Sequence, residues 1–350
     1  MACLVLTLLG MSDKRPSLDR VRKDGTRTLY ETSRDDRTEG LPRASDKPFL
    51  PRELPVADAR YAISREQARG GLGRILEAHD LRLDRPVAVK EPLYSGLDVE
   101  ARFIREALIT ARLQHPAIVP VHDLGRTEEG KPFYVMKMVA GRSLAEVLRG
   151  KQRLAERLSL LPNLIAVADA MAYAHAHGIV HRDLKPSNVL VGPFGETVIV
   201  DWGLAADLNA SRSYSVTGAY DLAVSELTTA GTVMGTPEYM PPEQAQGRSV
   251  DERADVYAIG AMLYHLLSGA PPYEAATSEE VLEKLITVDP IPISQRHSGV
   301  PAELAAIVTK AMARDRSHRY PTAKELREEL RRFETNQVLN PRRKSAGRRG

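Results

Sequence analysis

Three things are scarce in this 350-residue chain: cysteine, net charge and long apolar runs. The one cysteine, Cys3, cannot form an intrachain disulfide, which indicates a reducing compartment. The formal net charge is only +3, so the composition requires neither a nucleic-acid nor a membrane partner. No apolar run approaches the ~20 residues needed to cross a bilayer, so we expect no transmembrane segment. The chain does contain 43% apolar residues, enough for a sizeable core.

The two ends of the chain differ in composition from its middle. The opening Met1–Leu9 resembles a short signal core, but no basic segment precedes it and no small-residue cleavage site follows it. Residues 12–55 are rich in Arg, Asp, Lys, Pro, Ser and Thr without sustained periodicity. We therefore predict a disordered leader at 1–56, an ordered domain at 57–335 and a basic disordered tail at 336–350.

The ordered part changes from strands to helices along the chain. Period-2 patterns and turn residues predict strands at 61–67, 74–78, 85–91 and 133–139, with one amphipathic helix at 99–113. Further helices are predicted at 143–149 with Ser143 as N-cap, and at 158–177, 255–267, 278–286, 301–313 and 321–333. The last begins with Pro321 in its first turn. A small strand-rich segment followed by a larger helical one is an α+β arrangement.

The chemistry is concentrated in His181-Arg182-Asp183-Leu184-Lys185-Pro186-Ser187-Asn188, followed by Asp201-Trp202-Gly203. Phosphoryl transfer from ATP needs a carboxylate to accept the proton of the attacking hydroxyl. It also needs oxygen ligands to hold Mg²⁺ and a cation to offset the charge on the moving group. These two segments supply all of them, and the first matches the catalytic-loop pattern H-R-D-L-x-x-x-N.

A glycine-rich segment, Ala68–Gly73, lies between the first two predicted strands. Glycines there let the backbone approach phosphates, although such a segment alone is more often a simple hairpin. Its context strengthens the functional interpretation, because Val87-Ala88-Val89-Lys90 lies on the next strand and a helix with Glu106 follows. An isolated lysine and glutamate would normally be solvated surface charges. Their order relative to the glycine segment and the catalytic loop argues otherwise.

With these motifs in order, the chain resembles the eukaryotic-like (Hanks-type) protein serine/threonine kinases of bacteria from about residue 61 to about residue 333. The resemblance implies a bilobal fold, with a small β-rich lobe carrying one long helix at about 57–139 and a larger helical lobe at about 140–335. Further motifs that support it are Phe103–Glu106, His115-Pro116, Ile118-Val119, Gly235–Gln244, Asp255–Gly260 and Arg314–Tyr320.

The resemblance implies a role for each catalytic side chain. Asp183 would be the base that deprotonates the substrate hydroxyl, and Lys185 would steady the γ-phosphate. Lys90 would hold the phosphates and form an ion pair with Glu106. Lys185 also favours Ser/Thr over Tyr as the phosphate acceptor.

It likewise implies the ligands of the cofactors, ATP and Mg²⁺. Asn188 and Asp201 would bind the metal as hard oxygen donors. Apolar side chains would contact the adenine, and the glycine segment would cover the phosphates. The adenine-contacting residues are Ile75, Ala88, Met136, Val139 and Leu190, and the phosphate-covering residues are Ala68, Arg69, Gly70, Gly71, Leu72 and Gly73.

Supporting contacts follow from the same resemblance. Asp255, on a buried helix, should accept hydrogen bonds from the catalytic-loop backbone, because a buried unpaired carboxylate would be costly. Glu243 should pair with Arg319, and His181 should stack on Trp202.

The segment between Asp201 and Glu243 is rich in hydroxyls. Arg182 precedes the proposed base, and such an arginine commonly pairs with a phosphate on this segment. We therefore expect autophosphorylation at Thr228 or Thr229, with Thr232 and Ser225 as second choices, in a transient homodimer. The other interpretation is that these are only loop hydroxyls.

Three positions depart from the family pattern. Ala68 replaces the first glycine of G-x-G-x-x-G, which is tolerated if its φ stays negative. Trp202 replaces a phenylalanine, and Lys137 stands where a glutamate is common. None removes a catalytic group, so we expect an active enzyme with protein substrates.

Two alternatives remain. One is a pseudokinase that binds ATP as a scaffold, and the other is a kinase of small molecules, against which the Gly235–Gln244 segment argues. Because the chain ends soon after its last predicted helix, we expect a cytoplasmic protein. The basic tail is expected to be solvated, although binding to anionic lipid is the alternative.

Overall fold

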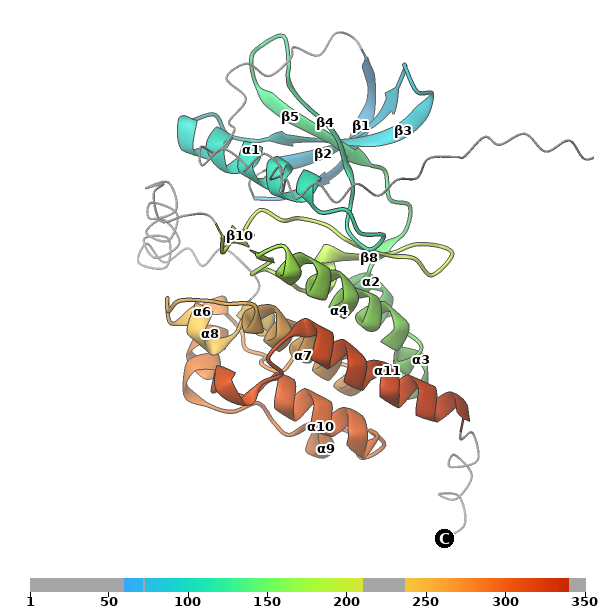
Figure 1. The fold of residues 1–350 in the computed structure, drawn as a ribbon, viewed down its shortest axis with the longest axis vertical. Coiled ribbons are helices and arrows are strands. Elements are labelled where there is room, and N and C mark those ends of the chain that lie inside the picture. Colours follow the sequence, from blue (N-terminus) through green and yellow to red (C-terminus); the bar gives the residue numbers. More distant parts are fainter. Residues whose placement is uncertain (1–59, 72, 210–236, 340–350) are drawn as a thin grey trace, which may run out of the picture. The chain divides into compact units, whose positions relative to one another are not determined.

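The computed structural model describes residues 60–71, 73–209 and 237–339, which form a sheet-containing part and a helical part (Figure 1). The sheet has five antiparallel strands in the order β1-β2-β3-β5-β4, and helix α1 lies along one face of it. The bounds are β1 Tyr61–Arg69, β2 Gly73–Asp80, β3 Arg85–Pro92, α1 Leu97–Arg112, β4 Val121–Arg126 and β5 Pro132–Lys137.

Strand β3 is buried on both faces, which determines where its lysine points. Val87 and Val89 belong to one apolar cluster, whereas Ala88 belongs to a second cluster that includes Phe103 of α1. Because side chains alternate along a strand, Lys90 lies on the same face as Ala88, toward α1. The sheet thereby presents this lysine to the helix that carries Glu106.

The helical part is built around α4 and α7, which are apolar on most of their circumference; α7 is almost completely buried, and more than half of the α4 residues are buried. Helix α11 packs on α4 and α10 packs on α7. The bounds are α2 Leu144–Arg149, α3 Leu154–Leu158, α4 Leu161–Ala176, α6 Pro242–Ala245, α7 Arg253–Ser268, α8 Ser278–Thr287, α9 Ile293–Arg296, α10 Ala302–Ala311 and α11 Ala323–Leu339. Three short 3₁₀ turns are η1 Pro186–Asn188, η2 Pro237–Tyr239 and η3 Arg316–His318.

Short strands carry the catalytic loop between the two parts. Strand β7 (Ile179–Val180) pairs with β10 (Ala206–Asp207), and β6 (Arg142–Ser143), β8 (Val189–Val191) and β9 (Thr197–Ile199) form a small sheet. Ile199 accepts a backbone hydrogen bond of 3.1 Å from Val119 and donates one of 2.8 Å to Ala117. The segment after α1 is therefore bonded to β9 in addition to the covalent link after β5.

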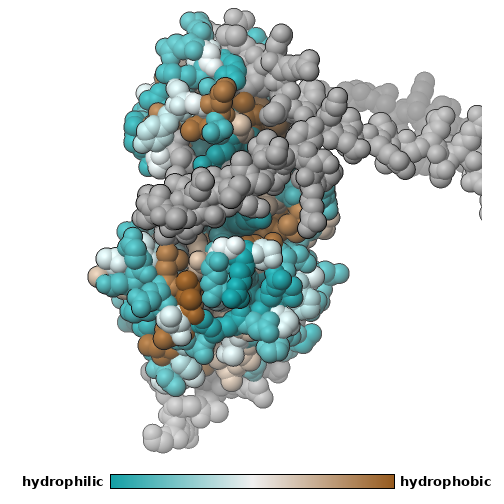
Figure 2. Space-filling view, turned by 90° about the vertical axis from the view of Figure 1, so that its left-hand side faces the viewer, coloured by the Kyte–Doolittle hydropathy of each residue, from teal (hydrophilic) through white to brown (hydrophobic). Residues whose placement is uncertain are grey.

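Apolar side chains are largely enclosed in the described part of the chain. On the face shown in Figure 2, hydrophilic residues cover most of the described surface, and apolar residues reach it in restricted bands. None of the described helices has the length and apolar character needed to span a bilayer.

The predicted strands and the predicted helix at 99–113 are present, with bounds that agree within two residues. Ser143 caps α2 as predicted, and the Glu146 carboxylate accepts the Ser143 N–H in return, which completes a capping box. The predicted helix at 158–177 is present as α4 but begins three residues later than predicted, at Leu161, and the short helix α3, which ends at Leu158, was not predicted. Pro162 explains the break between α3 and α4, because its ring would clash with the carbonyl of Leu158 in a continuous helix.

Three other differences concern strand β4 and the two ends of helix α11. Strand β4 was not predicted; it contains His122, Asp123 and Gly125, which are not typical strand residues. Helix α11 begins after Pro321, at Ala323, and the Thr322 hydroxyl accepts the Glu325 N–H at 3.2 Å. It runs to Leu339, four residues into the segment 336–350 that was predicted to be a disordered tail. The rest of that tail and the leader lie outside the described residues.

Candidate active site

The catalytic loop, residues 181–188, lies between β7 and β8 and positions Asp183 through its own side chains. Lys185 Nζ lies 2.8 Å and 3.1 Å from the two carboxylate oxygens of Asp183. Asn188 Nδ2 donates to the Asp183 carbonyl at 2.9 Å and to its Oδ2 at 3.2 Å. The turn η1 brings Asn188 back to Asp183, so the three polar groups predicted from the sequence form one cluster.

The backbone at Arg182 is held in a left-handed conformation, with φ of 67°. A non-glycine residue pays a steric cost there unless its surroundings hold it. Buried Asp255 accepts the N–H groups of His181 at 2.9 Å and Arg182 at 3.0 Å, as the sequence predicted. On the other side, the Gln244 side-chain amide donates to the Arg182 carbonyl at 2.8 Å. The loop that carries Asp183 is therefore clamped from α7 and α6.

Lys90, Glu106 and Asp201 converge from β3, α1 and the segment after β9. Lys90 Nζ lies 2.6 Å from Glu106 Oε1 and 3.4 Å from Asp201 Oδ1. Desolvation opposes the charge on Lys90, but Tyr134, Glu106 and Asp201 outweigh it and raise the pKa of the lysine. Lys90 is therefore a permanent cation that contacts both carboxylates.

Asp201 has the properties of a cation ligand. Desolvation acts to raise its pKa, but Lys90, His181 and Lys185 outweigh this effect and lower the pKa of Asp201. Its side chain is 49% exposed, and its backbone is left-handed with φ of 64°. An ionised, accessible carboxylate of this kind suits a hard divalent cation.

Asn188 can supply a second oxygen to such a cation, since its Nδ2 is already bonded to Asp183. Within the described ranges, no cluster of three or more His, Cys, Asp or Glu could hold a metal. One carboxylate and one amide oxygen fit a Mg²⁺ ion that keeps several waters and arrives with substrate phosphates. The donor set therefore fits magnesium bound together with a nucleotide.

The predicted adenine-contacting residues lie on adjoining elements. Ala88 and Met136 are buried in one apolar cluster, and Ile75 and Val139 pack against it. Leu190 is directly paired in the β8–β9 register with Val198, which belongs to the same cluster. The five side chains thus come from β2, β3, β5, the segment after it and β8.

The glycine segment forms a hairpin between β1 and β2. Gly70 N–H donates to the Gly73 carbonyl at 2.8 Å, and a Cβ at Gly73 would lie 2.9 Å from the Glu91 carbonyl oxygen. Only glycine fits there without displacing β3. Ala68 lies in β1, opposite Ile75, and its φ is not positive, which is the condition for accepting its methyl group. Arg69 is engaged by Glu66 at 2.7 Å, and Leu72 lies outside the described residues.

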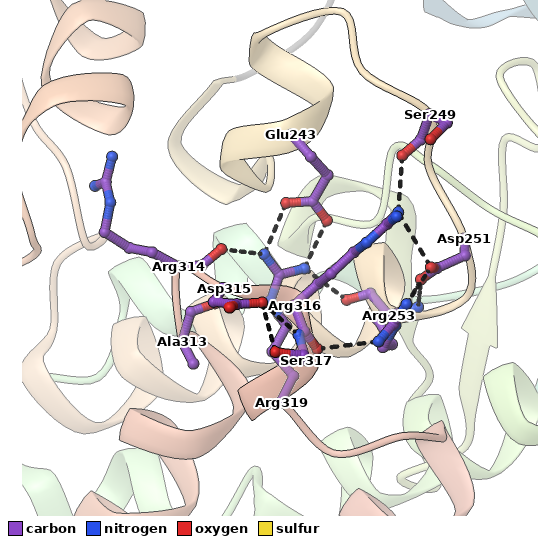
Figure 3. Close-up of polar contacts among 10 residues, drawn as sticks. All are labelled: Glu243, Ser249, Asp251, Arg253, Ala313, Arg314, Asp315, Arg316, Ser317 and Arg319. Atoms are coloured by element: carbon purple, nitrogen blue, oxygen red, sulfur yellow. Dashed lines mark hydrogen bonds and ion pairs between the residues drawn. The ribbon is translucent and has the colours of Figure 1, made fainter.

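A buried ion pair fastens the end of the segment that follows the catalytic residues (Figure 3). Arg319 donates to the two oxygens of Glu243 at 2.6 Å and 2.7 Å, and no part of the Arg319 side chain is exposed. Arg253 forms an adjoining pair with Asp251 at 2.6 Å. The predicted contact between Glu243 and Arg319 is therefore present.

The predicted stack of His181 on Trp202 is also present, with ring centroids 4.7 Å apart. Both side chains are buried, and they join the catalytic loop to the segment that carries Asp201. The hydroxyl residues expected to be phosphorylated, Thr228, Thr229, Thr232 and Ser225, lie outside the described residues, as do Gly235 and Thr236 of the motif before Pro237.

Comparison with known proteins agrees with this geometry. Residues 61–330 match the model of the protein kinase domain. This chain belongs to the protein kinase family. It is 37% identical over 286 residues to the serine/threonine-protein kinase PknB of Mycolicibacterium smegmatis, covering 80% of this chain and 44% of that protein.

Two other relatives are also named serine/threonine-protein kinases. The kinase is 36% identical over 290 residues to PknB of Mycobacterium leprae, covering 81% of this chain and 44% of that protein. It is 32% identical over 294 residues to serine/threonine-protein kinase PknD of Protochlamydia amoebophila, covering 78% of this chain and 30% of that protein. The chain thus spans less than half the length of these curated relatives.

The analysis of the sequence missed three residues that the structure brings into the site of this kinase. Gln244 was noted only as part of a motif, and its bond to the catalytic loop depends on the packing of α6. His175 Nε2 contacts Asp255 at 2.8 Å, which its position on α4 alone could not indicate. Tyr134 contacts Glu106, although its place in an apolar strand predicted only a core residue.

Proposed function

We propose that this kinase transfers the γ-phosphoryl group of ATP to Ser or Thr hydroxyls of proteins. One observation carries the proposal: Lys185 Nζ contacts both carboxylate oxygens of Asp183, and Asn188 Nδ2 bonds the same residue. A cation and an amide ligand for a metal, both held at a carboxylate base, are groups that phosphoryl transfer uses. The intact Lys90–Glu106 pair, at 2.6 Å, adds the second cation of the reaction.

Each side chain then has a chemical task. Asp183 orients the substrate hydroxyl and takes its proton as the oxygen attacks phosphorus. Lys185 and Lys90 offset the negative charge on the phosphoryl oxygens, and Glu106 keeps Lys90 in position. Asn188 and Asp201 would hold magnesium, which when bound offsets charge on the phosphates. Hydrophobic contacts with Ile75, Ala88, Met136, Val139 and Leu190 would hold the adenine.

Protein substrates are supported by residues 237–243, the described end of the segment before α7. The buried pair with Arg319 holds α6, and the preceding η2 is tied to α7 because the Tyr239 hydroxyl and His265 Nδ1 lie 2.6 Å apart. A rigid platform next to the catalytic loop suits an extended peptide better than a small molecule. The relatives' names, serine/threonine-protein kinase, agree with this substrate class.

The test is transfer of radiolabel from ATP to a generic protein substrate. Asp183→Asn should lower the transfer rate about 10²- to 10⁴-fold, the usual contribution of a positioned base. The control is Asp84→Asn, because Asp84 is 97% exposed and Asn tolerates its left-handed backbone. The pseudokinase alternative predicts nucleotide binding without transfer by the wild-type protein, and that result would overturn the proposal.

Regulation is proposed by the same logic. Autophosphorylation at Thr228 or Thr229, in a transient homodimer, would supply a phosphate to Arg182. Phosphosite mapping and the dependence of the rate on enzyme concentration test this directly. Full activity of the Thr228→Ala, Thr229→Ala double variant would contradict it.

The single cysteine supports a cytoplasmic place of action.

A further inference from the structure

Glu106 is bonded by two donors through the same oxygen. Its Oε1 accepts Lys90 Nζ at 2.6 Å and the Tyr134 hydroxyl at 2.7 Å. The other oxygen, Oε2, faces Gly203, where a Cβ would lie 3.3 Å away. The carboxylate thus lies where β3, β5 and the segment after Asp201 meet, and Tyr134 contacts only its lysine-facing oxygen.

Tyr134 is a rigid donor. It is 3% exposed, its ring centroid lies 5.1 Å from that of Phe103 in α1, and it is paired directly with Lys90 in the β3–β5 register. Burial, reinforced by Glu106, raises the pKa of Tyr134, so its hydroxyl keeps its proton and can only donate to a carboxylate. The ring cannot leave without opening the apolar cluster around it.

The arrangement matters because Lys90 has two acidic neighbours. It is closest to Glu106, but Asp201 Oδ1 is only 3.4 Å away. A lysine that moved toward Asp201 would neutralise the carboxylate needed for the cation, and the cation would then have to displace an ammonium group. A group that holds the Glu106 carboxylate in front of Lys90 therefore also keeps the Asp201 carboxylate available to bind the cation.

We propose that Tyr134 is a positioning residue that fixes the Glu106 carboxylate in front of Lys90 and so leaves Asp201 available for the divalent cation. The inference rests on the proposed function for its effect on turnover. Its effect on cation binding is independent of phosphoryl transfer. Without the hydroxyl, the carboxylate can turn about its last bond, and Lys90 divides its time between two carboxylates.

The experiment uses the full chain with Tyr134→Phe, which removes one oxygen and keeps the ring. The matched control is Tyr61→Phe, because the Tyr61 hydroxyl also donates to a carboxylate, Asp123, at 2.7 Å on the same sheet. Two readouts are followed during titration with Mg²⁺ at fixed ATP: phosphoryl transfer and intrinsic fluorescence. Trp202 is the only tryptophan of the chain and is adjacent to Asp201, so its emission reports cation binding without any turnover.

For Tyr134→Phe we expect both Mg²⁺ midpoints to rise about five- to tenfold and kcat to fall by a similar factor, which corresponds to about 1–1.4 kcal/mol and lies within the net contribution of one ordinary hydrogen bond. Tyr61→Phe should leave all three values at their wild-type level. A purely structural role would lower thermal stability in both variants alike and would not move the fluorescence midpoint. Unchanged midpoints in a folded Tyr134→Phe protein would overturn the inference.

Three further outcomes can be distinguished. If Tyr134→Phe does not fold, Tyr134→Met fills similar apolar space, and the same midpoints decide. If the wild-type protein never transfers phosphate but its fluorescence midpoint still shifts in Tyr134→Phe, the proposed function fails and the inference stands. If transfer occurs and neither midpoint shifts, the inference fails and the proposed function stands.

Discussion

Two residues of the catalytic site, Arg182 and Asp201, have left-handed backbones with φ of 67° and 64°. Each such conformation costs about 1–3 kcal/mol for a residue other than glycine. At Arg182, hydrogen bonds to both sides of the residue, from Asp255 and Gln244, offset that cost. The strain thus occurs at the positions that orient the proposed base and the proposed cation ligand.

A titratable residue outside the catalytic groups gives a prediction about pH. Burial, with a smaller effect of Arg157, lowers the pKa of His265 to about 4. In the unfolded chain this pKa is about 6.5, so the unfolded state binds more protons between pH 6.5 and about 4. The stabilisation that comes from keeping buried His265 neutral is complete above pH 6.5. As the pH falls below that value, the free energy of unfolding decreases by up to roughly 1.4 kcal/mol per pH unit.

His265→Gln should flatten this dependence, because glutamine can still accept the Tyr239 hydroxyl but does not titrate. Urea unfolding at several pH values between 4 and 7 measures it. His297→Gln serves as the control, since His297 is half-exposed and its Nδ1 accepts only the nearby Gly299 N–H. An equal pH slope in His265→Gln and the wild type would contradict the prediction.

At the scale of single residues, the polar groups that cluster in the candidate site could be predicted because each lies in a short motif whose order is visible in the chain. The residues that hold them could not. Gln244 and His175 act through contacts that join segments 62 and 80 residues apart, and Tyr134 lies 28 residues from Glu106. Such contacts depend on which helices and strands pack together. A local sequence pattern carries no information about that packing.

At the scale of elements, the hairpin β1–β2 contains a matched pair of glycines. A Cβ at Gly73 would lie 2.9 Å from the Glu91 carbonyl oxygen and 3.4 Å from Lys90 Cε, whereas a Cβ at Gly71 would meet nothing within 4 Å. Gly73→Ala should therefore push β2 from β3 and destabilise the protein by about 1–3 kcal/mol. It should also weaken ATP binding, because Lys90 is displaced.

Urea unfolding and nucleotide titration of Gly73→Ala and Gly71→Ala check this prediction. Gly71→Ala should keep the stability of the wild type. A Gly73→Ala protein with wild-type stability would show that the hairpin adjusts without cost.

Helices and strands were predicted well where an apolar pattern continued over many residues. They were predicted poorly where a proline or polar residues interrupted that pattern. The buried helix α7 was recognised within two residues at its start and one at its end. The start of α4 was placed three residues too early because Leu158 and Leu160 continue the apolar pattern, although Pro162 marks the first turn of the helix. Strand β4 was missed because its burial is only partial along most of its length.

At the scale of the whole molecule, the pair Glu243–Arg319 joins segments 76 residues apart in the interior of the helical part (Figure 3). Arg319→Met leaves a buried carboxylate without its partner, so we expect a loss of about 3–5 kcal/mol in the free energy of unfolding. The exposed pair Arg65–Glu77 has the same close geometry, at 2.7 Å, and Arg65→Met should cost less than about 1 kcal/mol.

Guanidinium or urea unfolding of both variants measures the difference. Glu243→Ala combined with Arg319→Met should lose less than the sum of the two single changes, because the two groups contact each other. Equal losses for Arg319→Met and Arg65→Met would show that the buried pair contributes no more than a surface one.

In the described residues, the backbones of the sheet-containing part and the helical part are joined at two places, in addition to side-chain contacts such as Lys90–Asp201. Besides the covalent crossing after β5, the backbone bonds between 117–119 and Ile199 hold the segment after α1 to β9. Two separated attachments define an axis, so the two parts can rotate about the line between them but cannot swing apart freely. Helix α1 ends at Arg112, close in sequence to one attachment, so Leu97 at its other end would sweep a larger arc than Glu106, which lies in the half of the helix next to Arg112. A rotation about this axis would carry Glu106 with the sheet relative to Asp201, while the proposed base at Asp183 stays with the helical part.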